Sequence, residues 1–355
     1  MGRVFRSLTP GRGTCATVVT ATGTRTSGAC SLASVHLPPD RETTVESDDR
    51  RVLVALGGNA LEGRGQGGIE DQVAGVARTM VRVVELIADG WQVVLVHGNG
   101  PQVGDLVHRD AMNAGRAPAY PLDWAVAETQ ATIGHSILNA LASAGADQGV
   151  DPAGAVVVSR VLVDADDPGF DQPTKPIGPY LDEEPDEPAA RWTLIEGKGW
   201  RRVVASPQPR ASLDLPAIRA LVAGGATVVA NGGGGIPTVR GPEGPWHGVA
   251  AVVDKDLAGA MLAGELGIAT YVILTDVAGV AVDHGTDDER WLGDVSVADL
   301  RRHQADGQFP AGSMGPKVEA VCRFIERGGG RAAIGALDDL AAVLAGDAGT
   351  QVRPD

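Results

Sequence analysis

The 355-residue sequence predicts an α/β fold with a mainly parallel sheet that helices cover on both faces. From residue 51 onward, short apolar runs alternate with longer segments of helical periodicity. The apolar runs show little polar alternation, which is typical of strands that are buried on both faces. Each run adjoins a helical segment or a glycine-rich turn, as parallel strands with crossover connections require.

The predicted elements follow one another in this alternating order. The first strand is followed by a helix whose apolar residues recur from Ile69 to Ile87, with Gly90 as its stop signal. Further helical patterns occur near residues 103–107 and 123–142. Residues 164–202 are rich in Pro, Asp and Glu and too long for an ordinary connection, so we interpret them as a lid or functional excursion. The predicted strands are 52–56, 93–96, 155–163, 227–230, 270–274 and 331–335.

Composition excludes several classes of protein. The formal charge of −15 repels phosphate backbones, so we expect no nucleic-acid partner. No apolar run approaches the roughly 20 residues that a membrane span needs, so we expect no membrane partner. The three cysteines match neither a metal-binding spacing nor a disulfide framework, which is typical of a reducing compartment, and we expect a cytoplasmic protein.

The first 50 residues have a different composition from the rest. Residues 1–39 carry four arginines and no acidic residue, contain much Ser, Thr and Gly, and show no sustained periodicity. A transit peptide would have the same composition. We favour a disordered N-terminal extension over residues 1–50, followed by one domain over residues 51–355.

Three of the predicted strands end in glycine-rich segments. These are Gly57-Gly58-Asn59, Gly98-Asn99-Gly100 and the run from Gly232 to Gly235. In an open parallel sheet, ligands bind beyond the carboxyl ends of the strands. Glycine there lets backbone N–H groups approach an anion, so the three segments predict a phosphate cradle. The Walker lysine motif and the GxGxxG dinucleotide motif are both missing, which excludes the two common nucleotide folds that carry them.

Lysine is rare in this chain and its positions are informative. Of 30 basic residues only four are lysine, namely Lys175, Lys198, Lys255 and Lys317. Lys255 and Lys317 each stand in the first turn of a predicted helix, where a cation is unfavourable unless an anion binds. We therefore expect these two to clamp a transferring phosphoryl group, with Asp256 orienting their ammonium groups.

Seven motifs together resemble the carbamate kinase family, part of the amino-acid kinase superfamily. The similarity covers residues from about 51 to 352. It implies a three-layer α/β/α sandwich with the amino-acid kinase fold, a protruding subdomain at about 164–202 and a nucleotide-binding half at about 225–355. It also implies a homodimer. The motifs are LGGNAL, HGNGPQVG, QPTKPIGPY, KGWRRVVASPQP, NGGGGIPTV, VVDKDLAG and AGSMGPK.

The resemblance implies a reaction and the residues that perform it. The reaction is reversible phosphoryl transfer from carbamoyl phosphate to ADP, giving ATP and carbamate, usually within arginine fermentation. Mg²⁺ is expected to bind with the nucleotide phosphates. Lys198 is interpreted as structural, and His97 is expected only to hydrogen-bond its loop. The implied catalytic residues are Lys175, Lys255, Asp256 and Lys317; the carbamate and phosphate loops contain Gly57, Gly58, Asn59, Gly98, Asn99, Gly100, Gly233 and Gly234; the nucleotide side contains Thr275, Asp276, Gly312, Ser313 and Met314.

Two departures and two alternatives stay open at this point. AGSMGPK lacks a proline that usually precedes Gly-Ser-Met, and LTDVAGVAV lacks an aromatic residue that some members carry, which leaves the adenine contacts open. One alternative is a sister kinase that acts on acetylglutamate, aspartate or a nucleoside monophosphate. The other is a non-catalytic oxyanion-binding module, which would have no need for all three lysines.

Overall fold

The computed structural model describes residues 50–57, 68–113, 115–187, 190–195, 197–241, 244–310 and 312–355. Gly58 and Asn59 of the first glycine-rich segment lie outside these residues. So does the predicted N-terminal extension, apart from Arg50. None of the described helices is both long and apolar enough to cross a membrane.

The centre of the fold is an eight-stranded sheet in the order β15-β17-β16-β12-β1-β2-β9-β3. Neighbouring strands are parallel except for β16 and β17. The inner strands are buried on both faces, as their uninterrupted apolar sequences predict. The strands are β1 Arg51–Leu56, β2 Gln92–His97, β3 Gly154–Val156, β9 Thr227–Val229, β12 Thr270–Thr275, β15 Asp294–Ser296, β16 Arg331–Ala336 and β17 Thr350–Arg353.

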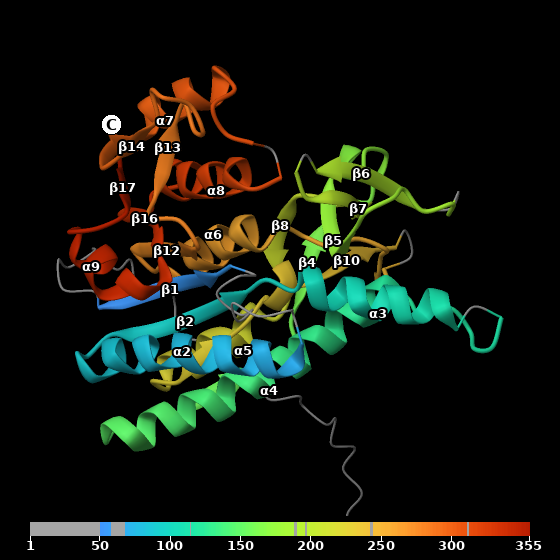
Figure 1. The fold of residues 1–355 in the computed structure, drawn as a ribbon. Helices are drawn as coiled ribbons and strands as arrows, with labels where there is room; N and C mark the ends of the chain where they lie inside the picture. Colours follow the sequence, from blue (N-terminus) through green and yellow to red (C-terminus); the bar gives the residue numbers. More distant parts are fainter. Residues whose placement is uncertain are drawn as a thin grey trace, which may run out of the picture. The chain divides into compact units, whose positions relative to one another are not determined.

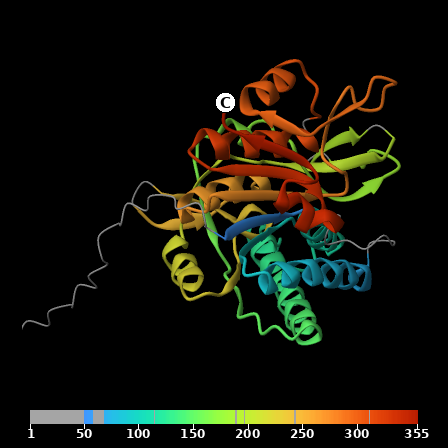
Figure 2. The ribbon, with the colours of Figure 1, turned by 90° about the vertical axis from the view of Figure 1, so that its left-hand side faces the viewer.

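Helices cover both faces of this sheet, which confirms the predicted three layers (Figure 1). Helices α2, α4 and α9 pack against one face, where alternate residues of β1 such as Val52 and Val54 point. Helices α5, α6, α7 and α8 pack against the other, which receives Leu53 and Ala55 (Figure 2). The helices are α2 Ile69–Ala88, α4 Leu122–Gln148, α5 Leu215–Ala223, α6 Lys255–Leu266, α7 Val297–Ala305, α8 Met314–Glu326 and α9 Leu340–Ala345.

Smaller sheets lie beside the main one. A four-stranded sheet has the order β11-β10-β4-β8, and β13 pairs with β14. The described residues of the predicted lid segment include a three-stranded antiparallel sheet in the order β5-β7-β6, which is called the subdomain below. The strands are β4 Arg160–Val163, β5 Lys175–Leu181, β6 Arg191–Ile195, β7 Gly199–Val204, β8 Pro209–Ser212, β10 Ile236–Arg240, β11 Trp246–Gly248, β13 Val280–Val282 and β14 Arg290–Leu292.

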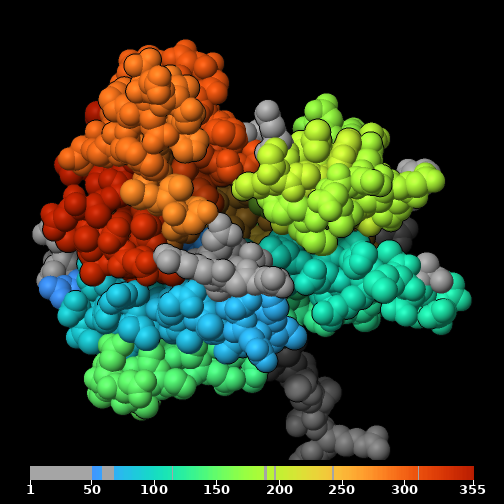
Figure 3. Space-filling view, viewed as in Figure 1, coloured from blue at the N-terminus to red at the C-terminus, as the bar shows by residue number. Residues whose placement is uncertain are grey.

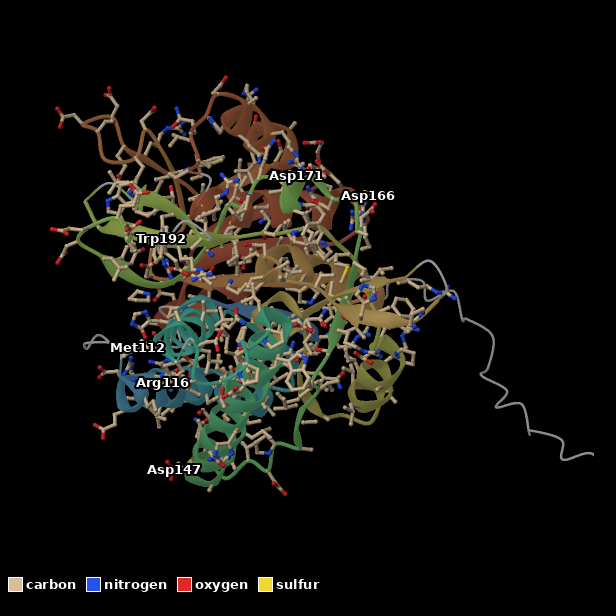
Figure 4. All side chains as sticks on the ribbon, turned by 90° about the vertical axis from the view of Figure 1, so that its right-hand side faces the viewer. Met112, Arg116, Asp147, Asp166, Asp171 and Trp192 are labelled. Carbon is tan, nitrogen blue, oxygen red and sulfur yellow. The ribbon has the colours of Figure 1, made fainter. Side chains whose placement is uncertain are left out.

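This three-stranded subdomain packs closely on helix α3 (Gly100–Met112). A methyl group at Gly104 of α3 would lie 1.9 Å from the backbone nitrogen of Gly178 in β5, so the two backbones touch. Met112 at the end of α3 and Trp192 of β6 lie on the same side of the view in Figure 4. The surface is hollowed between this subdomain and the segment that carries α7 and α8 (Figure 3).

Two sequence predictions are wrong in detail. The single strand expected at 155–163 is two strands, β3 in the main sheet and β4 in the four-stranded sheet. The chain leaves the main sheet because Ser159 hydrogen-bonds helix α4 through Gln130. Helix α4 also runs beyond residue 142 to Gln148, since its Ala-rich end has high helix propensity until Gly149 ends it in the left-handed region.

Candidate active site

The first turn of α6 carries three charged residues of the site. Asp254 is the N-cap, and its Oδ1 accepts hydrogen bonds from the backbone N–H groups of Asp256 at 2.9 Å and Leu257 at 3.2 Å. Helix α6 contacts β1, β8 and α8 and is buried along most of its length. Lys255 and Asp256 are therefore buried too, and a buried charge is costly unless it has a partner.

Asp256 supplies that partner for two lysines. One carboxylate oxygen accepts a hydrogen bond from the Lys255 ammonium group, and the other lies 3.0 Å from Nζ of Lys317. Lys317 comes from the first turn of α8, as predicted. The side chains of Lys255, Lys317 and Asp256 are 9%, 15% and 3% exposed. The structure thus brings together the lysines of two helix N-termini around one carboxylate.

The pKa values follow from burial and these contacts. Burial lowers the pKa of Lys255 to about 8, although the Asp256 carboxylate opposes this effect. Burial alone would raise the pKa of Asp256, but Lys255 and Lys317 outweigh it and hold that pKa well below its usual range. For Lys317, burial lowers the pKa, but the nearby aspartates outweigh it and raise the pKa overall. At neutral pH the cluster therefore holds two cations and one anion.

A second aspartate, the N-cap of α6, also belongs to the site. Oδ2 of Asp254 lies 2.5 Å from Nζ of Lys175, the first residue of β5 in the subdomain. Asp254 is buried, whereas the Lys175 side chain is 25% exposed. Lys175 precedes Asp254 by 79 residues, so no local pattern could have indicated their pairing. All three predicted lysines thus meet the start of α6.

The fourth lysine takes no part in this cluster. Lys198 lies between β6 and β7, with its ammonium group 5.9 Å from the ring centroid of Tyr180. This contact is within the subdomain, in agreement with a structural role.

Gly57 after β1 and the glycine-rich segments after β2 and β9 lie at the same rim of the sheet, because these three strands are parallel neighbours. Asn99 is the N-cap of α3 and is buried, with its Nδ2 donating to Thr129 Oγ1 at 2.9 Å. Gly233 and Gly234 have φ angles of 63° and 88°. A methyl group at Gly234 would lie 2.2 Å from the carbonyl oxygen of Val253, just before Asp254. This loop therefore needs glycine to lie against the start of α6.

The predicted role of His97 in its loop is confirmed. Nδ1 of His97 lies 2.9 Å from the carbonyl oxygen of Gly98, and burial lowers the pKa of the imidazole to about 4. The ring is therefore neutral at physiological pH, with Nδ1 as donor. A methyl group at Gly232 would lie 2.3 Å from Nε2, so the ring also packs against the third glycine-rich segment.

The predicted nucleotide side is more open. Thr275 Oγ1 donates to Asp276 at 3.0 Å at the end of β12. Asp276 lies within electrostatic reach of Lys317, whose pKa it helps to raise. Gly312 and Ser313 are exposed, and Met314 is half-buried at the start of α8. Lys317 is thus in contact with Asp256 and within electrostatic reach of Asp276 on the predicted nucleotide side.

Comparison with known proteins identifies the family. The sequence profile of the amino acid kinase family matches residues 50–336. A carbamate kinase of Thermococcus kodakarensis is 47% identical over 312 residues, which span 85% of this chain and 99% of that protein. This chain belongs to the carbamate kinases of the amino acid kinase family. Another carbamate kinase, from Halobacterium salinarum, is 42% identical and matches 85% of this chain and 98% of its own length.

Solved structures give the same assignment. A carbamate kinase from Giardia lamblia bound to AMP-PNP is 33% identical, with a TM-score of 0.79 over 87% of this chain and all of that one. A crystal structure from Aeropyrum pernix K1 is 43% identical, with a TM-score of 0.80 over 86% of this chain and all of that one. The fold and family expected from the sequence motifs are confirmed.

Proposed function

We propose that this carbamate kinase family member transfers a phosphoryl group reversibly between carbamoyl phosphate and ADP, giving ATP and carbamate. Carbamate then breaks down to ammonia and carbon dioxide. The observation that carries the proposal is the convergence of Lys175, Lys255 and Lys317 on two aspartates at the start of α6. Three cations beside glycine-rich loops match a reaction whose main requirement is charge neutralisation and positioning.

The chain's own residues can perform this transfer without a general base. An oxygen of the ADP β-phosphate attacks phosphorus, the bond from phosphorus to the carbamoyl oxygen breaks, and carbamate leaves with the electron pair. No proton moves in this step. Lys255 and Lys317 would stabilise the negative charge on the transferred group, and Asp256 would hold both ammonium groups in place. Lys175 would approach the same group from the subdomain.

We assign the glycine-rich rim to carbamoyl phosphate and the open rim to the nucleotide. The glycine-rich rim contains Gly57, Gly98, Asn99, Gly100, Gly233 and Gly234, all buried or half-buried, and the open rim contains Thr275, Asp276, Gly312, Ser313 and Met314, all half-buried or exposed. Carbamoyl phosphate is small, so backbone donors and one amide side chain can bind it. Gly58 and Asn59 are assigned to the first rim from the sequence alone, because they lie outside the described residues.

Mg²⁺ is proposed to enter with the nucleotide. The described residues offer no group of three His, Cys, Asp or Glu side chains that could hold a metal ion, so Mg²⁺ here would need phosphate oxygens as ligands. When bound, it would supply positive charge to the nucleotide phosphates. Lys317 and Asp276, which lie within electrostatic reach of each other, are the side chains expected nearest to it.

The homodimer and the cytoplasmic location stay predictions. In support of a protein contact, Tyr120, Trp124 and Trp246 line one groove and are all exposed. Sedimentation velocity of the purified protein should give a species of twice the monomer mass. A monomer at micromolar concentration would contradict the dimer.

The acceptor can be tested against the sister kinases directly. ATP consumption with Mg²⁺ should be measured with carbamate, acetylglutamate, aspartate or a nucleoside monophosphate as acceptor. We expect turnover with carbamate and background rates with the others. Turnover with another acceptor would make this a sister kinase, and no turnover with retained nucleotide binding would favour an oxyanion-binding module.

A further inference from the structure

Helix α4 holds the third glycine-rich segment through Gln130. Nε2 of Gln130 donates to the carbonyl oxygens of Gly232 at 2.9 Å and Ser159 at 3.1 Å, while its Oε1 accepts from the backbone N–H of Ser159 at 2.8 Å. The side chain is 1% exposed. Ser159 in turn accepts from the backbone N–H of Asn231 through its Oγ at 2.7 Å. One amide group therefore holds the start of the loop, directly at Gly232 and through Ser159 at Asn231. The carbonyl oxygen of Ser159 also accepts from the backbone N–H of Ile236 at 2.9 Å, at the other end of the loop.

The preceding residue of α4 holds the second glycine-rich segment. Thr129 Oγ1 accepts from Asn99 Nδ2 at 2.9 Å and donates to the carbonyl oxygen of Val126 at 2.7 Å. Thr129 is also 1% exposed. The two segments touch each other, because a methyl group at Gly233 would lie 2.2 Å from Nδ2 of Asn99. Two consecutive residues of one helix thus hold two segments that are in mutual contact.

The chemistry of the amide explains why glutamine stands at position 130. The site needs two donated hydrogen bonds and one accepted one at a single buried point, which a carboxylate or an aliphatic side chain cannot provide. Without the amide, the carbonyl of Gly232 would keep only the N–H of Gly235 as its partner and Ser159 would lose its hydrogen bonds to α4, so the loop would no longer be held in place. Gly234 lies against Val253, so such movement would reach the start of α6.

We propose that Gln130 and Thr129 are positioning residues that set the spacing between the two glycine-rich segments of the carbamoyl phosphate site. The inference rests on the proposed function, because it assigns these segments to that substrate. Neither side chain needs to touch the substrate. Their replacement should weaken binding of carbamoyl phosphate while leaving ADP binding, at the open rim, unchanged.

The test compares two buried glutamines. Gln351 of β17 is 2% exposed and its Nε2 donates to the carbonyl oxygens of Val343 at 3.0 Å and Ala348 at 2.7 Å. Strand β17 lies near the opposite edge of the sheet from β9. Gln130→Met should raise the KM for carbamoyl phosphate roughly tenfold or more, with the KM for ADP within about twofold of the wild type. Gln351→Met should lower the melting temperature without changing either KM.

Equal KM values for carbamoyl phosphate in Gln130→Met and Gln351→Met would overturn the proposal while leaving the function intact. If Gln130→Met fails to fold, two variants of Thr129 test the proposal instead. Thr129→Val should raise the KM for carbamoyl phosphate, and Thr129→Ser, which keeps the hydroxyl group, should have the wild-type KM.

If the wild type makes no ATP, the proposed function fails, and hydrogen exchange still tests how the loop is held. Faster exchange of amides 231–235 in Gln130→Met than in Gln351→Met would support the positioning role, and equal exchange would overturn it.

Discussion

Lys255 and Lys317, on the helices α6 and α8 that cover the main sheet, are called the main-body pair. They differ from Lys175, the cation of the subdomain. Lys255 and Lys317 share one buried carboxylate and are 9% and 15% exposed, whereas Lys175 reaches Asp254 from the three-stranded sheet and is 25% exposed. The first two are desolvated before any substrate arrives, so their interactions with a phosphoryl group are strong and need little reorganisation. Lys175 keeps water contact and depends on a separate subdomain. The main-body pair should therefore matter more for catalysis.

The largest expected effect comes from the main-body pair. Lys255→Ala or Lys317→Ala should each lower kcat by about a hundredfold or more, since each removes a positioned cation from the transition state. Steady-state kinetics should be measured alongside circular dichroism to confirm folding. Lys198→Ala is the matched control and should keep wild-type kcat, because Lys198 is exposed and its ammonium group lies over the Tyr180 ring, outside the lysine–aspartate cluster. Near-wild-type turnover in either main-body variant would exclude the clamp.

The next largest effect on kcat is expected from removing the negative charge of Asp256, which Lys255 and Lys317 share. Asp256→Asn leaves two buried ammonium groups without their carboxylate, and kcat should fall by roughly ten- to a hundredfold. The pKa of Lys255 should fall further, because Asp256 is the main group that opposes its lowering. The alkaline limb of the activity profile should therefore move to lower pH. An alkaline limb at the wild-type pH would mean that Asp256 does not set the pKa of Lys255.

Substitution of Lys175 or of its partner Asp254 should lower kcat less. Lys175→Ala should lower kcat by about tenfold, since it removes a more solvated cation. Asp254→Asn keeps a side-chain oxygen for the helix cap but removes the charge beside Lys175, so helix α6 should persist and the effect should be weaker still. If Lys175→Ala proved as damaging as Lys317→Ala, the distinction between the two groups of cations would be lost.

The smallest effect is expected from raising the pH of the wild-type assay to about 8, and it tests Lys255 without any substitution. Burial lowers the pKa of Lys255 to about 8, and the proposed phosphoryl clamp requires the charged form. As pH rises through 8, Lys255 loses its proton in the free enzyme, so kcat/KM for carbamoyl phosphate should fall above pH 8. A bound phosphate anion favours the ammonium form, so the fall in kcat should occur at higher pH. A kcat/KM that stays flat to pH 10 would contradict the assignment.

Local sequence signals could predict the elements that carry the main-body pair. Lys255 in the first turn of α6 and Lys317 in the first turn of α8 each depend on signals within a single helix, and both lie where the sequence predicts. The pairing of Lys175 with Asp254 could not be predicted, because it depends on how the subdomain packs on α3 through Gly104 and Gly178. The break between β3 and β4 likewise depends on Gln130, which belongs to another element.

ATP formation from ADP, Mg²⁺ and carbamoyl phosphate, corrected for spontaneous hydrolysis, should be measured for the wild type and Lys317→Ala together, because this assay tests both the reaction and its site. We expect enzyme-dependent ATP from the wild type and a rate about a hundredfold lower from the variant. No ATP from a folded, nucleotide-binding wild type would contradict the reaction. Equal rates from the two proteins would contradict the lysine cluster as its site.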